Sequence, residues 1–518
     1  MSLLKADISG RIVKRINSFL EGYRQNIAIL AKDSEEISYF LDSCLSTLSS
    51  RDVIYILEDL SYINAEVFFR NTSYTILNQF LSQDLSLDKL LSLCTEVLPQ
   101  TAEYIKDTLK KKAVNFIDIL ELVNKFINES GTQCVLVVKE FTNLRNLFHS
   151  YHQDFSKFII LQKKCMVILA SSAVEEAKEI LGTDLHLLFG NFELISLDTF
   201  PLVDAYLGLA NLLKPLSPTP HFLGFFINML QSNSLYYELL AKEIKSLYQA
   251  DNEDKSIIIT VEKTLYNMNS SLYRKFINKV DILKAKYKDY QTLITLLLLV
   301  AQGYIRKTDL MFFLGVNKQN LTSKLERLLE MEYLQNVGNI YKVNDSLFSF
   351  WLDHIFRFYI NCKILDTNRR AMLFLAKMRE EVEMFKENFY KEKVQRIREL
   401  FASFKDDTLV IEDNRVRFPR LNKVNIISYP ENRFNILVGE GDEILFAAVK
   451  EEETNDADIL KFETITDSIK IKNLKKIFIS LGELNSSAKL IAKESRIQLW
   501  DINQINSLLS IYRKPILV

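Results

Sequence analysis

Glycine and proline are scarce in this chain of 518 residues, which holds 13 Gly and 8 Pro. These counts lie far below the usual shares of about 7% and 5%. Both residues interrupt helices, so we expect a helix-rich protein. Backbone cradles for phosphate need glycine where the main chain approaches a ligand, and no glycine here is followed by lysine. An intact Walker A loop, GxxxxGK[ST], is therefore excluded.

Cysteine pairs, net charge and long apolar runs are also missing. The five cysteines never fall at CxxC spacing, which argues against a zinc ribbon or a disulfide scaffold. The chain has 65 basic and 66 acidic residues, so overall charge gives no support for strong nucleic-acid binding. The longest apolar run begins at Leu293 and is about half as long as a bilayer requires. The first residues hold no apolar signal segment, and we expect a cytoplasmic protein without a membrane partner.

Four short apolar runs divide the first part of the chain. They are Asn26–Ala31, Val53–Leu57, Cys134–Val138 and Met166–Ala170, and helix-like segments separate them. Continuous apolar strands that alternate with helices indicate a parallel sheet covered on both faces. The sequence therefore predicts an α/β domain over about the first 212 residues.

For the middle of the chain, the sequence predicts a helical region followed by a compact unit with the element order of a DNA-binding domain. The proline-rich stretch Lys214–His221 is the best linker, and no strand signal follows it until about Tyr290. Next come a helix, a turn, a short helix and a longer helix at Asn317–Glu330, followed by a hairpin with Gly338 and Asn339 at its tip. This order is typical of a winged helix-turn-helix, with Asn317–Glu330 as the recognition helix.

The last part changes from helix to strand. Residues from Trp351 to about Phe404 read as helical. From Leu409 onward we predict strands within TLVIE, NKVNIISY, RFNILVG, EILFAAVK and KKIFISL, and then a helix from about Asn503. These elements predict a separate small α/β or α+β domain.

The order of these segments resembles the archaeal-type ATPases of the STAND branch of P-loop NTPases. The resemblance rests on the order of strands in the segments that contain VIYILEDL, CVLVVKEF, MVILASSA and LLFGNFELISLDTF. It implies a P-loop NTPase-like parallel sheet core, a helical segment, a winged helix-turn-helix and a small C-terminal α/β domain like restriction endonucleases of the PD-(D/E)XK type. The implied boundaries are 1–213 for the ATPase-like domain, 214–289 for a helical lid-like domain, 290–345 for the winged helix, 346–404 for a helical connector and 405–518 for the nuclease-like domain.

The segment at the phosphate-loop position has lost most of the motif. It reads AKDSEEIS, so the two glycine positions are Ala31 and Glu36, the lysine position is Ile37, and the hydroxyl of Ser38 alone fits. Carboxylates at Asp33 and Glu35 join Glu36 where a polyphosphate would lie. We interpret this pattern as an ordinary acidic helix N-terminus, because carboxylates suit the helix dipole; the alternative is a loop that still binds a nucleotide.

The segment at the Walker B position is altered as well. An aspartate should hold magnesium there and a glutamate should prepare water, but VLVVKEF places Lys139 at the first position and Glu140 at the second. Ala170, Ser171 and Ser172 lie where the family often has a Gly-Ser-Ser sensor, so two of its polar groups are kept. We hypothesise that Lys139 pairs with a carboxylate of the loop, Asp33, Glu35 or Glu36; the alternative is that Lys139 points to solvent.

The nuclease-like segment lacks its metal ligands. An aspartate and an E-x-K triplet on neighbouring strands would hold the metal, whereas the matching positions here are Asn435, Ala448 and Lys450. Asp442 and Glu443 lie between the strands, in a predicted turn; the alternative is that they supply the missing metal ligands. We expect no metal site in the chain; His149 and His152 near Asp154 are two ligands without a third.

The winged helix needs no catalytic residue and is complete. Residues of its recognition helix that can face outward and meet DNA are Lys318, Gln319, Asn320, Ser323, Lys324 and Arg327. Glu326 and Glu330 dilute this positive charge. Packing within the chain is the competing role for this module.

These losses predict a pseudo-ATPase, that is, a non-catalytic scaffold or regulator that binds a protein partner, such as a related ATPase, or nucleic acid. We expect no cofactor. One alternative is an atypical NTPase that binds ATP and Mg²⁺ through Ser38 and Glu140, with Ser171 and Ser172. Another is a DNA-binding regulator that acts through Lys318, Gln319, Asn320, Lys324 and Arg327.

Overall fold

The computed structural model describes residues 6–46, 53–61, 63–185, 191–197, 201–231, 233–363, 365–411, 414–429, 433–468 and 474–518. The chain divides into two compact units. The first comprises Met1–Phe200 with Asn233–Leu235, and the second comprises Pro201–Ser232 with Tyr236–Val518. We describe each unit by itself.

The first unit is built on a parallel five-stranded sheet of order β2-β3-β4-β1-β5. Its strands are β1 (Asn26–Leu30), β2 (Val53–Asp59), β3 (Gln133–Lys139), β4 (Cys165–Ser171) and β5 (Phe192–Ser196). The four predicted apolar runs form the first four strands, and β5 lies within the segment that supports the resemblance. Burial on both faces explains why these strands are continuously apolar.

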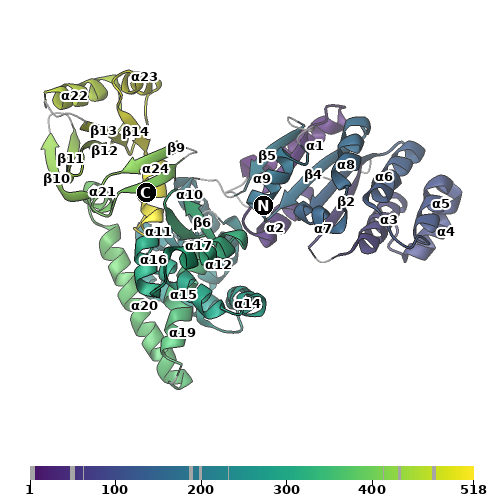
Figure 1. Cartoon of the computed structure of the whole chain (residues 1–518), viewed down its shortest axis with the longest axis horizontal. Coiled ribbons are helices and arrows are strands. Elements are labelled where there is room, and N and C mark those ends of the chain that lie inside the picture. Colours follow the sequence, from purple (N-terminus) through teal and green to yellow (C-terminus); the bar gives the residue numbers. More distant parts are fainter. Residues whose placement is uncertain are drawn as a thin grey trace. The chain divides into compact units, whose positions relative to one another are not determined.

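Helices cover both faces of this sheet (Figure 1). Side chains of one face, such as Ile27 and Val137, pack with α1 (Ala6–Leu20) and α2 (Ser34–Leu45). The other face packs against a larger group of helices. That group contains α3 (Ala65–Leu81), α4 (Leu87–Val97), α5 (Pro99–Thr108), α6 (Phe116–Ser130), α7 (Leu144–Leu147), α8 (Tyr151–Leu161) and α9 (Val174–Gly182), with the short 3₁₀ turn η2 (Phe141–Asn143). The predicted α/β core, a parallel sheet covered by helices on both faces, is confirmed.

The second unit begins with helices. They are α10 (Leu202–Leu212), α11 (Pro220–Leu230), α12 (Ser234–Leu247, which starts in the first unit), α13 (Glu253–Val261), the π-helical η4 (Glu262–Tyr266) and α14 (Ser271–Lys286). The predicted helical segment is thus confirmed. The finer division at Lys214 stays a proposal, because α10 groups with the helices that follow it.

The elements of a winged helix-turn-helix come next. They are α15 (Tyr290–Ala301), α16 (Lys307–Leu314), α17 (Lys318–Glu330) and the antiparallel strands β6 (Leu334–Val337) and β7 (Ile340–Val343). Gly338 has φ +82° at the hairpin tip, and a Cβ there would lie 1.9 Å from the carbonyl oxygen of Thr408. Both the left-handed backbone and this close approach therefore require glycine.

Helices then lead to a second sheet. They are α18 (Ser346–Phe350), the π-helical η5 (Trp351–Phe356), α19 (Arg357–Asn361), α20 (Thr367–Phe389) and α21 (Lys393–Phe401), and the hairpin β8 (Asp407–Ile411) and β9 (Asn414–Phe418) follows. The sheet β10-β11-β12-β13-β14 consists of β10 (Leu421–Tyr429), β11 (Phe434–Gly441), β12 (Ile444–Lys450), β13 (Leu474–Ser480) and β14 (Gln498–Asp501).

This C-terminal sheet is mixed. Strands β10, β11 and β12 are antiparallel, whereas β12, β13 and β14 are parallel. Parallel neighbours need crossovers, and α22 (Asp456–Asp467) and α23 (Ser486–Glu494) provide them before α24 (Ile502–Ile511) ends the domain. The predicted small α/β domain is confirmed. No helix of the described residues is long and apolar enough to cross a bilayer.

Candidate functional site

Polar side chains gather where β1, β2, β3 and β4 of the first unit end. All four strands run parallel, so their carboxyl ends meet at one edge of the sheet, and ligands of open α/β sheets bind at that edge. The residues predicted for nucleotide binding fall there: Ser38 follows β1, Glu140 follows β3, and Ser171 ends β4.

The loop after β1 is too short to surround a phosphate. Helix α2 begins at Ser34, and the N–H of Ile37 already donates to the carbonyl of Asp33 at 3.1 Å. The backbone amides that a phosphate loop would aim at its ligand therefore lie in a helical turn. Asp33 caps this helix, and its side chain accepts from the N–H of Glu35 at 3.0 Å. A carboxylate of the chain thus stands where the helix N-terminus would attract an anion, as the acidic-terminus interpretation predicts.

Glu36 occupies the second glycine position and is buried, with 1% of its surface exposed. Its Oε1 accepts from the backbone N–H of Ser234 at 2.8 Å and from the Ser234 hydroxyl at 2.9 Å. Ser234 belongs to the segment Asn233–Leu235, which groups with the first unit. Glu36 is therefore a structural residue and does not face a ligand.

Lys139 makes the contact that defines the site. Its Nζ lies 3.1 Å from Oδ2 of Asp59 and donates to the Ser38 hydroxyl at 3.1 Å. The hypothesis that Lys139 pairs with Asp33, Glu35 or Glu36 is wrong in its partner: among the described residues the ion pair is with Asp59. Strands β2 and β3 are neighbours in register, with Asp59 opposite Lys139, so the pair forms across two adjacent strand ends.

Glu140 is held by the end of β4. Its carboxylate accepts from the N–H of Ser172 at 3.0 and 3.2 Å and from the Ser171 hydroxyl at 3.3 Å. The hydroxyl of Ser171 also lies 3.3 Å from that of Thr142. Glu140 has φ +50°, a left-handed conformation that is costly for a residue with a side chain. The chain thus orients this carboxylate toward its own backbone.

Electrostatics follow from these contacts. Burial raises the pKa of Glu140, although the hydrogen bonds from Ser172 and Ser171 oppose the shift. Burial alone would raise the pKa of Asp59, but hydrogen bonds from Ser61 and the ammonium of Lys139 outweigh it and hold the pKa below its ordinary value. A cation at the magnesium position repels a divalent metal, since like charges at close range are unfavourable.

Ser38, Glu140, Ser171 and Ser172 are predicted as site residues from the sequence, whereas Asp59 is not. The missed signal was present in the strand VIYILED, because Asp59 ends β2 as Lys139 ends β3. Adjacent parallel strands place such terminal residues opposite each other.

In the C-terminal domain, too, the residues at the expected metal-site positions bind neighbouring side chains of the chain itself. Lys450 pairs with Asp458 of α22 at 2.5 Å, and both side chains are buried. Asn435 accepts from the hydroxyl of Ser428 at 2.8 Å. Glu443 lies in the predicted turn and pairs with Arg417 at 3.1 Å. Lys450, which the resemblance places at the lysine of a nuclease triplet, is therefore paired within the domain.

The residues of α17 that we predicted to meet DNA fall into two groups, one exposed and one paired within the domain. Lys318, Gln319 and Asn320 are exposed at the start of α17. Lys324, which we expected to face outward, is buried: it pairs with Asp289 at 2.5 Å, and Arg327 pairs with the same carboxylate at 3.0 Å. The expectation that Lys324 faces outward is wrong, because its ammonium pairs with Asp289, just before α15, and only 11% of its side chain stays exposed.

The three residues considered as metal ligands, His149, His152 and Asp154, lie at the start of α8 and in the turn before it. His149 lies in an exposed turn, and His152 and Asp154 lie in the first turn of α8. Among the described residues no group of three His, Cys, Asp or Glu side chains is placed to hold a metal ion.

Comparison with known proteins finds similarity among solved structures. No protein-family model and no curated protein matches the chain. It is similar to a Walker-type ATPase of Pyrococcus abyssi, with 15% identity and a TM-score of 0.47 over 67% of this chain and 95% of that one. It is also similar to the ORC2 protein of Aeropyrum pernix (9% identity, TM-score 0.43, 70% and 94% covered). A third similar structure is the Aeropyrum pernix ORC1 protein in complex with DNA (8%, 0.34, 67% and 91%).

Proposed function

We propose that the chain is a pseudo-ATPase: a non-catalytic scaffold or regulator that keeps a P-loop NTPase-like core and binds a protein partner or nucleic acid. The contact of Lys139 with Asp59 and Ser38 carries this proposal. An ammonium stands where the ATPase mechanism needs a metal-binding carboxylate, and it hydrogen-bonds the serine hydroxyl that would ligate magnesium. The polar groups at these strand ends are thus satisfied by one another.

The loss of the phosphate-binding lysine supports the same conclusion. Hydrogen bonds to charged groups are worth about 1.5 to 3 kcal/mol each, and Ile37 can make none. Asp33 adds a negative charge at the helix N-terminus. Both changes lower the affinity for a polyphosphate.

The competing function is an atypical NTPase that uses Ser38 and Glu140 with Ser171. Equilibrium binding of labelled ATP with Mg²⁺ separates the two. We expect no saturable binding that depends on Glu140, so Glu140→Gln should behave as the wild type does. Glu176, an exposed glutamate on α9, provides the matched control Glu176→Gln. Micromolar binding that is lost in Glu140→Gln but kept in Glu176→Gln would establish the NTPase instead.

A protein partner is the first choice of ligand for this scaffold. Helix α16 exposes two neighbouring aromatic side chains, Phe312 at 80% and Phe313 at 49%, whose ring centroids are 5.3 Å apart. Exposed aromatic side chains of this kind suit protein contact. A pull-down from the native cytoplasm with the wild type and Phe312→Ser tests this: a specific partner should be retained by the first and lost by the second.

DNA binding through the winged helix is the second candidate, and the exposure of Lys318, Gln319 and Asn320 favours it. These residues begin the helix in the recognition position, where phosphates and base edges are contacted. A gel shift at low salt that Lys318→Glu abolishes would support it. No shift at low salt would exclude it.

A further inference from the structure

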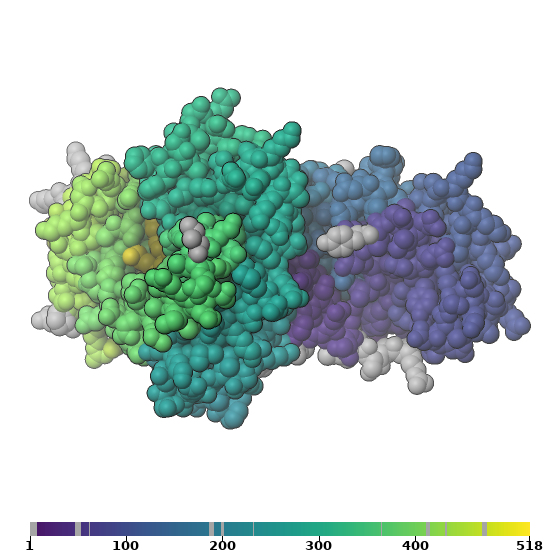
Figure 2. All heavy atoms as spheres, turned by 90° about the horizontal axis from the view of Figure 1, so that it is seen from below, coloured from purple at the N-terminus to yellow at the C-terminus, as the bar shows by residue number. Residues whose placement is uncertain are grey.

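The second unit contains a cavity of about 730 Å³ that none of the functions above uses. Its lining residues come from α11, from the turn before α16, from η5, from α20 and from the segment after α24. Figure 2 shows the surface hollowed where the C-terminal segment, drawn in yellow, lies recessed between green and teal segments. Ligand pockets for small molecules have volumes of about 300 to 1,000 Å³. The cavity therefore has the size of a small-molecule site.

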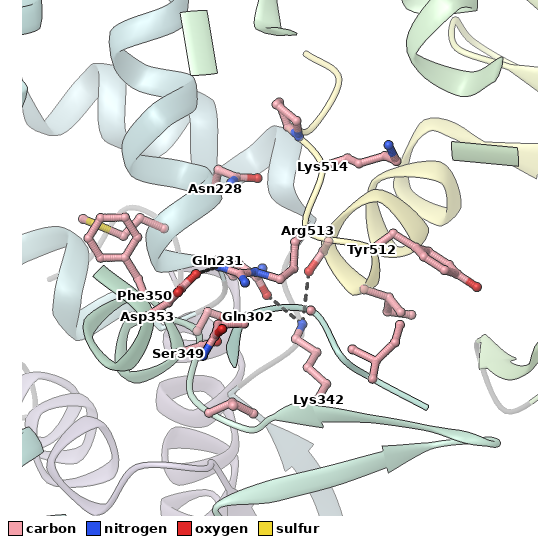
Figure 3. Close-up of a pocket in the computed structure, with 18 of the residues that line it drawn as sticks. Asn228, Gln231, Gln302, Lys342, Ser349, Phe350, Asp353, Tyr512, Arg513 and Lys514 are labelled. Atoms are coloured by element: carbon pink, nitrogen blue, oxygen red, sulfur yellow. Dashed lines mark hydrogen bonds and ion pairs between the residues drawn. The ribbon is translucent and has the colours of Figure 1, made fainter. Parts of the chain in front are cut away.

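Two cations lie at its centre. The ammonium of Lys342 donates to the side-chain oxygen of Gln231 at 2.9 Å and to the hydroxyl of Ser510 at 3.1 Å, and the guanidinium of Arg513 pairs with Asp353 at 2.8 Å. Figure 3 shows the side chains of Gln231, Lys342, Asp353 and Arg513 pointing toward one another from different segments of the chain. Their hydrogen bonds fix both cations in place, as recognition of an anionic group requires.

The lining as a whole carries an excess of positive charge. Its cations are Arg306, Lys342, Lys405, Arg513 and Lys514, and its carboxylates are Asp353 and Glu381. Arg306 is compensated by Asp407, which lies outside the lining. Four cations then stand against two carboxylates, and this balance favours an anionic ligand.

Neutral polar groups surround this charge. Side-chain amides line the cavity at Asn228, Gln231, Gln302 and Asn388. The Nδ1 atom of His354 is buried and has no hydrogen-bond partner among the described residues; the nearest carboxylate oxygen, of Glu381, is 3.8 Å away. Burial lowers the pKa of His354 to about 4, so its imidazole is neutral at pH 7. Such groups offer donors and acceptors to a heterocyclic base or a sugar.

Aromatic rings complete the wall. Phe350 and Phe385 line the cavity, and each packs edge-on against Phe225. Phenyl groups beside amides and cations are the combination that binds a planar base and a phosphate together.

From this geometry we infer that the cavity is a binding site for a nucleotide, with its phosphate at Lys342 and Arg513 and its base among the amides and phenyl rings. The site is separate from the strand ends of the first unit. Its existence does not depend on whether those strand ends bind ATP.

Calorimetry of the full chain with ADP, without magnesium, tests the inference. We expect saturable binding with a dissociation constant below about 1 mM. Lys342→Gln should weaken it about tenfold or more, because a charged hydrogen bond to phosphate is lost. Lys461→Gln, at an exposed lysine of α22, should leave it unchanged. Photo-crosslinking with 8-azido-ADP should label peptides that contain residues 342–354 or 510–515.

Other results would overturn the inference. They are the absence of saturable ADP binding, an affinity that Lys342→Gln leaves unchanged, or labelling confined to residues 26–38. Adenosine, ribose 5-phosphate and inorganic phosphate serve as separate arms of the titration. Equal affinity for ribose 5-phosphate or for phosphate would refute the nucleotide assignment, because the base would then contribute nothing. Labelling does not rely on a variant, so it remains decisive if Lys342→Gln fails to fold.

Discussion

Replacing Lys139 by methionine removes the ammonium at the Walker B position but keeps the apolar stem of the side chain. The stem is worth keeping, because only 14% of the Lys139 side chain is exposed. Its ion-pair partner Asp59 is 44% exposed and therefore screened by solvent, so the pair contributes about 0.5 to 1 kcal/mol. The hydrogen bond to Ser38 adds about 1 kcal/mol. We expect Lys139→Met to lower the free energy of unfolding by about 1 to 2 kcal/mol.

Differential scanning calorimetry of the full chain measures this loss. In a unit of about 200 residues, each kcal/mol shifts the midpoint by about 2 to 4 °C, which gives a decrease of about 2 to 8 °C. Both tryptophans, Trp351 and Trp500, belong to the second unit. Tryptophan fluorescence therefore identifies the transition of the second unit, which should not move.

A double-mutant cycle isolates the ion pair. Lys139→Met and Asp59→Asn should couple by about 0.5 to 1 kcal/mol at pH 7. Because the pKa of Asp59 is lowered in the folded state, the stabilisation is present above the unfolded pKa of about 4 and is lost as the pH falls below it. Lys178→Met, which breaks an exposed pair on α9, should change the midpoint little. An unchanged midpoint in Lys139→Met, with no coupling to Asp59, would refute the reasoning.

Three further predictions concern other buried or exposed charges. Burial raises the pKa of Glu58 to about 8, so the folded state holds a proton that the unfolded state releases. The free energy of unfolding should therefore fall by up to about 1.4 kcal/mol per pH unit between about pH 5 and 8. Calorimetric midpoints measured across this pH range should show the decline in the wild type and lose it in Glu58→Gln. Lys318→Glu should weaken any DNA gel shift at an unchanged melting temperature, whereas Lys324→Met should lower the melting temperature because it breaks the ion pair between the buried Lys324 and the half-buried Asp289. Asp458→Ala should cost about 3 to 5 kcal/mol in urea unfolding followed by tryptophan fluorescence, since it leaves a buried lysine unpaired, and an effect below 1 kcal/mol would contradict this.

The sequence predicts the framework of this protein well, because strands buried on both faces must be apolar throughout. The runs that became β1 and β4 show this, as does the hairpin tip at Gly338, where the backbone leaves no choice of residue. By contrast, β9 escaped prediction, since its sequence NRVRF mixes charges into a short strand whose pairing with β8 decides its structure.

Side-chain partners were harder to predict than elements. Lys139 lies in the site because it ends a strand that the sequence predicts. Its pairing with Asp59 could not be predicted, because it depends on which strands are neighbours in the sheet. Lys324 has the spacing of an exposed residue of α17, yet Asp289 from outside that helix draws it inward. Periodicity within one helix cannot reveal a charge that another segment contributes.

The most direct test of the account is a crystal structure of the full chain grown with a non-hydrolysable ATP analogue and Mg²⁺. We predict that the Lys139 ammonium keeps its contacts of 3.1 Å with both Asp59 and Ser38, with no nucleotide at the strand ends. Density for a triphosphate between Ser38 and Glu140, with Lys139 displaced from Asp59, would contradict the central claim.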